Sequence, residues 1–171
     1  KKALDTVTFT VPAGSTVALV GPSGGGKTTA ASLIPRFWDV DSGSVAVGGV
    51  DVREIDPKVL MEQVAFVFQN NRLFKTTILE NVRASRPEAT REEVLRALEA
   101  AQCSDIIEKM PNGVDTIIGT HGTFLSGGEQ QRIALARAIL KDAPIVVLDE
   151  ATAFADPENE ALIQEAFAKL T

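Results

Sequence analysis

A glycine-rich segment ends in a lysine and a threonine whose side chains could hold phosphate and a metal ion. Residues 21–28 read GPSGGGKT and fit the pattern G-x-x-x-x-G-K-[ST]. Glycines let successive backbone N–H groups point into one concavity, and a helix expected after the loop adds its positive N-terminal dipole. Lys27 can reach the β- and γ-phosphates of a nucleotide, and the Thr28 hydroxyl can ligate Mg²⁺. We expect ATP to contact Gly21, Pro22, Ser23, Gly24, Gly25, Gly26, Lys27, Thr28 and Thr29.

The context of this segment favours a phosphate loop over a glycine-rich turn with an incidental lysine. A short β-branched run, residues 16–20, precedes it, as a buried strand would, and a helical pattern follows it.

Two acidic residues follow the apolar run at residues 145–148. An aspartate just past a buried strand, here Asp149, can hold Mg²⁺ through water. Glu150 beside it could polarise the attacking water as a general base. Alone, the pair could equally be a solvated strand end, but the glycine-rich loop favours the catalytic interpretation.

A third motif, residues 125–132, reads LSGGEQQR. Ser126 and Glu129 have the spacing of a capping box, which predicts a helix start with outward-facing N–H groups and a second anion site. The motif closely resembles the signature of ABC ATPases, usually written L-S-G-G-Q, with Glu129 in place of the common glutamine. The resemblance covers essentially the whole chain, because the loop, the signature and the acidic pair follow the family's order.

The resemblance implies how two chains share one nucleotide. In the family, a head-to-tail dimer closes each signature, here Ser126, Gly127, Gly128 and Glu129, over the partner's γ-phosphate. The capping role holds in either case. Gln69 matches the Q-loop glutamine, which contacts Mg²⁺ and the attacking water, although a polar strand end is the alternative. Asp156, in AFAD where SALD is commoner, is the expected contact across the dimer.

The resemblance also implies a membrane partner. Residues 70–74 and 77–82 look like the surface that receives coupling helices of a transmembrane domain in exporter-type members. Residues 115–122 occupy the place of the X-loop, where Thr120 replaces the usual glutamate. His121 precedes the signature, so it is not the family's switch histidine. That histidine and the aromatic residue that stacks on adenine are expected outside residues 1–171, and we interpret the chain as a fragment truncated at both ends.

The elements that must position these residues alternate between strands and helices, which indicates a parallel sheet with helical cover and an α/β class. Strands are expected at residues 7–11, 16–20, 64–68 and 145–148, with a turn and a short strand at 41–49. Helices are expected at residues 27–37, 57–63, 81–110, 126–141 and 158–171. The resemblance implies a P-loop NTPase core (1–69 and 142–171), a small antiparallel β part, and a helical subdomain at about 70–141.

Composition limits the classes of function. The chain has 171 residues, 44% of them hydrophobic and 23% charged, which suits one folded domain. A net charge of −6 disfavours a general nucleic-acid surface, and a single cysteine, Cys103, fits a reducing compartment. No apolar run approaches the roughly 20 residues of a membrane helix.

We therefore expect an ATP-binding and hydrolysing domain that powers an ABC transporter by ATP-driven dimerisation. It would act at the cytoplasmic face of the cell membrane in its parent protein and be soluble as a fragment. Residues 151–160 look similar to bacterial half-transporters of iron-siderophores. The alternatives are a non-transport ABC protein acting on DNA or ribosomes, which the short segment 69–126 and the acidic charge disfavour, and a catalytically silent interaction module.

Overall fold

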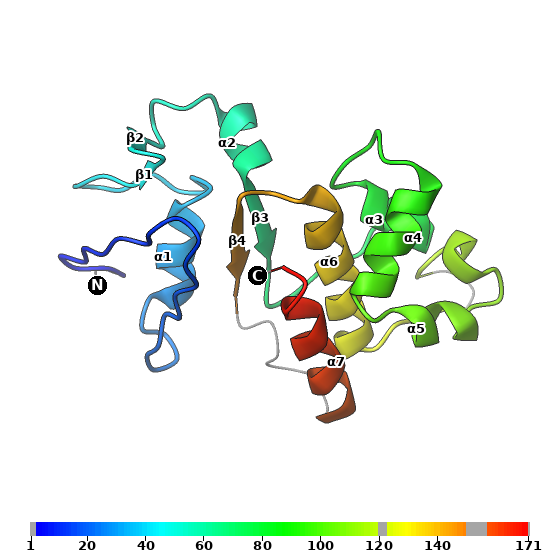
Figure 1. Ribbon diagram of the computed structural model, residues 1–171. Coiled ribbons are helices and arrows are strands. Elements are labelled where there is room, and N and C mark those ends of the chain that lie inside the picture. The colour runs from blue at the N-terminus through cyan, green and yellow to red at the C-terminus, as the bar shows by residue number, and fades with distance from the viewer. Residues whose placement is uncertain (1–2, 120–122, 150–156, 171) are drawn as a thin grey trace. The chain divides into compact units, whose positions relative to one another are not determined.

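The computed structural model describes residues 3–119, 123–149 and 157–170 (Figure 1). The chain divides into two compact units, residues 1–64 and residues 65–171, and each is described by itself.

The described residues of the first unit, 3–64, form two short helices and one β-hairpin. Helix α1 spans Lys27–Leu33 and α2 spans Pro57–Gln63, while strands β1 (Ala46–Val47) and β2 (Val50–Asp51) pair antiparallel. The turn between the strands consists of Gly48 and Gly49, both with positive φ, which is the backbone of a tight hairpin turn. The hairpin confirms the small antiparallel β part.

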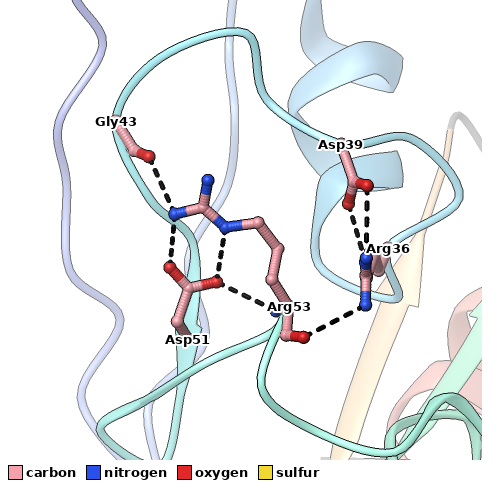
Figure 2. A network of polar contacts seen from close by, with 5 residues as sticks. All are labelled: Arg36, Asp39, Gly43, Asp51 and Arg53. Atoms are coloured by element: carbon pink, nitrogen blue, oxygen red, sulfur yellow. Dashed lines mark hydrogen bonds and ion pairs between the residues drawn. The ribbon is translucent and has the colours of Figure 1, made fainter.

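Two arginines connect the hairpin to the segment that follows α1 (Figure 2). Arg53 binds both carboxylate oxygens of Asp51, at 3.0 and 2.6 Å, and donates to the Gly43 carbonyl at 3.2 Å. The Arg53 side chain and its backbone N–H lower the pKa of Asp51 to about 2. Arg36 pairs with Asp39 and donates to the Arg53 carbonyl. Arg36 has a φ of 59°, which ends the helical conformation, and α1 therefore stops at Leu33 rather than at the expected residue 37.

The strands expected at residues 7–11 and 16–20 are a wrong prediction. Across the described residues, neither segment joins a strand ladder, and Val20 is 93% exposed. A strand needs a neighbouring strand that supplies backbone hydrogen bonds. Alternation and β-branched residues indicate only that a segment favours the extended conformation. The parallel sheet is therefore confirmed only in part.

That part lies in the second unit, where β3 (Val64–Val67) and β4 (Ile145–Leu148) are hydrogen-bonded neighbours. Figure 1 shows the two arrows running side by side in the same direction. Both strands agree with the sequence patterns that predicted them.

The other regular elements among the described residues of the second unit are helical. Its helices are α3 (Ile78–Arg83), α4 (Arg91–Ala100), α5 (Ser104–Lys109), the 3₁₀ turn η1 (Gly113–Asp115), α6 (Gly127–Lys141) and α7 (Pro157–Phe167). The expected helix over 81–110 is divided into three, because Pro87 cannot continue a helix and Gln102 has a φ of 58°. The capping box of Thr90 and Glu93 begins α4 as expected.

Helix α6 lies at the centre of the second unit's apolar core. Its Ile133 and Leu135 are fully buried in one cluster with Val82 of α3, Leu98 of α4 and Ile163 of α7. Figure 1 shows α3, α4 and α7 gathered around α6. The start of α6, which carries the signature, is thus fixed by a well-packed helix. The expected division into a core and a helical subdomain at 70–141 stays a prediction.

No helix in the described ranges combines the length and the apolar character that crossing a membrane requires.

Candidate functional site

The glycine-rich loop lies in the first unit, and its backbone requires glycine at position 26. Gly24 and Gly26 have φ values of 74° and 87°, a conformation that other residues rarely adopt. A Cβ added to Gly26 would lie 2.7 Å from the Ala3 carbonyl oxygen. Within the loop, Gly25 donates its N–H to the Pro22 carbonyl at 3.0 Å. Residues 24–26 therefore form a tight backbone turn directly before α1, the type of turn that can present N–H groups to an anion.

Lys27 reaches back over this loop from the first position of α1. Its Nζ donates to the carbonyl oxygens of Gly21 and Pro22, both at 3.0 Å. The ammonium thereby compensates two oxygens that would otherwise repel a phosphate at the loop. Thr28 and Thr29 follow in the first turn of α1.

Asp149 and Gln69 come together at one edge of the β3–β4 pair. The Asp149 N–H donates to the Val67 carbonyl at 2.9 Å, and Gln69 is two residues beyond Val67. Asp149 is 8% exposed, and Gln69 is half-buried. Ligands of parallel α/β sheets bind at the carboxyl ends of the strands, which is where both residues lie. Glu150 and Asp156 lie outside the described residues.

The signature forms the expected capping box. Glu129 donates its N–H to Ser126 Oγ at 3.2 Å, and Ser126 donates its N–H to Glu129 Oε2 at 2.8 Å. The other oxygen, Oε1, lies 3.7 Å from Lys109 Nζ of α5. The carboxylate is thus turned toward its own helix and an ammonium group. Gly127 and Gly128 follow in the first turn of the 15-residue helix α6.

An ion pair between a buried arginine and a half-exposed aspartate also ties α5 to α6. Arg132, almost fully buried, makes two hydrogen bonds to the Asp105 carboxylate, at 2.6 and 2.9 Å, and one to the Gln102 carbonyl. The Arg132 guanidinium lowers the pKa of Asp105. Burial raises the pKa of the nearby Cys103 thiol to about 12, so Cys103 is an inert core residue.

One segment expected to face a membrane partner, residues 77–82, pairs with the described part of the expected X-loop, residues 115–119. Thr77 and Ile117 form an antiparallel bridge, flanked by hydrogen bonds from Ile78 N–H to the Thr116 carbonyl and from Ile118 N–H to the Thr76 carbonyl. Phe74 and Ile117 are 61% and 48% exposed. Thr120 and His121 lie outside the described residues.

Sequence reasoning missed two polar residues that organise the segment after Gln69. Asn81 is fully buried, and Arg137 of α6 donates to both its side-chain and its backbone oxygens. The available signal was the place of Arg137 among the apolar residues Ile133, Ala136 and Leu140, because a cation on a buried helix needs acceptors.

Comparisons with known proteins agree with these motifs. A family model described as "ABC transporter" matches residues 4–153. An ATP-dependent lipid A-core flippase of Vibrio vulnificus (strain YJ016) is 50% identical over 171 residues, which is 99% of this chain and 29% of the relative. The flippase of Desulfotalea psychrophila is 47% identical over 170 residues (99% and 30%). That of Escherichia coli (strain K12) is 50% identical over 169 residues (98% and 29%).

The chain thus spans less than a third of the length of these relatives, which do not confirm the narrower resemblance to siderophore half-transporters. The match to the family model extends from before the glycine-rich loop to beyond the acidic pair. The chain therefore belongs to the ABC transporter family, as the ATPase domain of such a protein.

Proposed function

We propose that the chain hydrolyses ATP at a site that a second ABC ATPase domain completes, head to tail. Residues 21–29 of one domain would hold the phosphates, and residues 126–129 of the other would close over the γ-phosphate. Two features of the chain support this: a glycine turn before α1 and a capped helix start at α6, both suited to binding anions. In a head-to-tail dimer, each nucleotide would use the turn of one domain and the helix start of the other. Asp156 would contact the partner domain.

The observation that carries the proposal is the hydrogen bond from Asp149 N–H to the Val67 carbonyl, which aligns Asp149 with the end of the strand that leads to Gln69. Both side chains offer oxygen, the ligand that Mg²⁺ prefers, so the donor chemistry fits this ion. Together with the Thr28 hydroxyl they would hold Mg²⁺, which when bound neutralises charge on the phosphates.

In this proposal Glu150 accepts a proton from the attacking water, which Gln69 orients. The water oxygen bonds to the γ-phosphorus as the bond to the bridging oxygen breaks, and ADP leaves. Lys27 stabilises negative charge on the transferred group.

The proposed partner is a transmembrane domain at the cytoplasmic face of a membrane. It would contact residues 70–74 and 77–82, and the exposed side chains of Phe74 and Ile117 support an apolar docking surface there. Because the relatives are named as flippases of lipid A-core, we propose an amphiphilic lipid as the transported class.

Mixed dimers of the full-length protein test the composite site. The variants Lys27→Ala and Ser126→Arg should each lack ATPase activity, since each spoils both sites of its own dimer. Dimers with one copy of each, purified through two different tags, should regain part of the activity, because one site then has an intact loop and an intact signature.

Two controls keep this test sharp. Thr90→Arg removes an equivalent capping residue from α4 and should stay active, so loss of a helix cap alone does not explain Ser126→Arg. Glu150→Gln should bind ATP without hydrolysing it. Mixed dimers as inactive as their parents would refute the shared site, and a Glu150→Gln variant with normal turnover would refute the assigned base.

A further inference from the structure

Arg137, in the C-terminal half of α6, binds the segment that leaves Gln69. Its Nη1 donates to the Arg72 carbonyl at 3.1 Å, and its Nε and Nη2 donate to the backbone and side-chain oxygens of Asn81 at 2.7 and 2.6 Å. Its guanidinium carbon also lies 5.4 Å from the centre of the Phe74 ring, within the range of a cation–π contact. One side chain of the signature helix thus has several anchors around residues 72–81.

Asn81 extends this attachment from α3, which packs against α6 (Figure 1). Its buried amide accepts from the Phe74 N–H at 2.8 Å and donates to the carbonyls of Phe74 and Thr77, both at 3.0 Å. Residues 72–76 form no helix or strand, and the Thr77–Ile117 bridge supplies backbone bonds only at the end of the segment. The side chains of Asn81 and Arg137 supply hydrogen bonds to the part before the bridge, so the shape of that part depends on them.

A second attachment lies closer to the signature. The Asn71 amide donates to Gln131 Oε1 of α6 and to the Phe68 carbonyl. Helix α6 consequently holds the segment at two points, through Gln131 near its start and through Arg137 further along. The end of β3, in contrast, is bound to β4 by the Asp149–Val67 hydrogen bond. Gln69 stands between these two attachments.

From this arrangement we infer that Arg137 is a positioning residue, which makes residues 71–77 follow α6 and so sets the position of Gln69 relative to Asp149. The inference rests on the proposed function, in which Gln69 orients water and Ser126 at the start of α6 meets the partner's nucleotide. Engagement of the signature would then reach Gln69 of the same chain through α6. Misplacing a reacting group by about 1 Å costs about a hundredfold in rate, so the attachment matters for turnover.

The first measurement is the ATPase rate of the full-length protein with Arg137→Met. We expect kcat to fall roughly tenfold to a hundredfold. KM for ATP should stay unchanged, because residues 21–29 bind the phosphates. Arg137→Lys should be intermediate, since lysine keeps the charge but loses the guanidinium's fixed set of donors. A rise in KM for ATP as large as the fall in kcat, or an unchanged kcat, would overturn the inference.

A matched control separates positioning from stability. Arg86 is another partly buried arginine of the same unit, and it binds Glu93 and Glu88 rather than residues 71–77. Arg86→Met should lower thermal stability while leaving kcat at the wild-type value. If both methionine variants lower kcat equally, Arg137 has only a structural role.

A double-mutant cycle with Gln69→Ala gives the sharpest readout. If Arg137 acts through Gln69, adding Arg137→Met to Gln69→Ala should cause no further loss of kcat. If the fold-losses of kcat of the two single variants multiply in the double variant, the inference is contradicted. Should Arg137→Met fail to fold, Asn71→Ala removes the other attachment, and its loss of kcat must show the same non-additivity. Glu150→Gln tests the proposed function separately: if it is inactive while Arg137→Met turns over normally, only the inference fails.

Discussion

The backbone N–H of Asp149 donates a 2.9 Å hydrogen bond to the carbonyl oxygen of Val67. This bond fixes the register at the end of the β3–β4 pair, so an acidic side chain and the segment leading to Gln69 meet at one edge. The bond belongs to the backbone, and the chemistry of residue 149 can therefore be changed without changing the register.

Asp149→Asn should lower the affinity of the site for Mg²⁺ while leaving the fold intact. Asparagine keeps the shape and the N–H but loses the carboxylate charge, so we expect Mg²⁺ affinity to fall roughly tenfold to a hundredfold. Titrating ATPase activity of the full-length protein with Mg²⁺ measures this. Asp142→Asn, at the end of α6, is the control. An unchanged Mg²⁺ titration would remove Asp149 from the metal site.

Gly26→Ala should destabilise the first unit more than Gly43→Ala does. Both glycines have φ above 80°, so both substitutions impose roughly 1–2 kcal/mol of backbone strain. A Cβ at Gly26 also meets the Ala3 carbonyl oxygen at 2.7 Å and Leu4 Cδ2 at 2.9 Å, whereas a Cβ at Gly43 meets nothing within 4 Å. Urea unfolding gives the two differences in free energy. Equal losses would mean that the close approach of Ala3 to the loop does not matter for stability.

The sequence predicted best the features that depend on neighbours three or four residues apart. Pro57 and the capping boxes at Thr90 and Ser126 define their helix starts by such local bonds, and α2, α4 and α6 begin as those signals indicate. The apolar runs that became β3 and β4 were also recognised. The sequence pattern alone thus places two candidate site residues of the second unit, Gln69 and Asp149, at strand ends.

Features that depend on distant partners were missed. The alternation at residues 7–11 indicates that a strand is favoured. Strand pairing also requires a partner strand, which the local sequence pattern does not specify. Arg137 and Asn81 are 56 residues apart in sequence, and the residues around each of them do not predict that the two side chains are in contact. Their contact follows from how α3 packs on α6, which is a property of the assembled core.

Glu129→Gln should preserve both the signature helix and activity. Glutamine can fill the third position of a capping box, so the losses are the attraction to Lys109 and the attraction of the charge to the N-terminal dipole of α6, each about 0–1 kcal/mol. Glu129→Ala removes the reciprocal bond to the Ser126 N–H as well and should cost more stability. Thermal unfolding of both variants measures the difference. A large loss with glutamine would show that the carboxylate charge itself holds the signature.

Asp105→Asn should reduce the acid sensitivity of the second unit. Arg132 lowers the pKa of Asp105 in the folded chain, so this carboxylate contributes stability that is fully present above its unfolded pKa of about 3.9 and is lost as the pH falls through the lower folded value. Asparagine cannot supply the charge at any pH. The variant should therefore be less stable than the wild type at pH 7, and the difference should shrink as the pH is lowered below 4.

Urea unfolding of the wild type and Asp105→Asn at several pH values measures this narrowing. Glu108→Gln, an exposed carboxyl of the same helix α5, is the matched control. The loss at neutral pH is expected to be large for a single surface-facing carboxylate, because its partner Arg132 is almost fully buried and would keep an unneutralised charge. A difference that stays constant from pH 7 to pH 3 would show that Asp105 stabilises α5 and α6 by hydrogen bonding alone, without its charge.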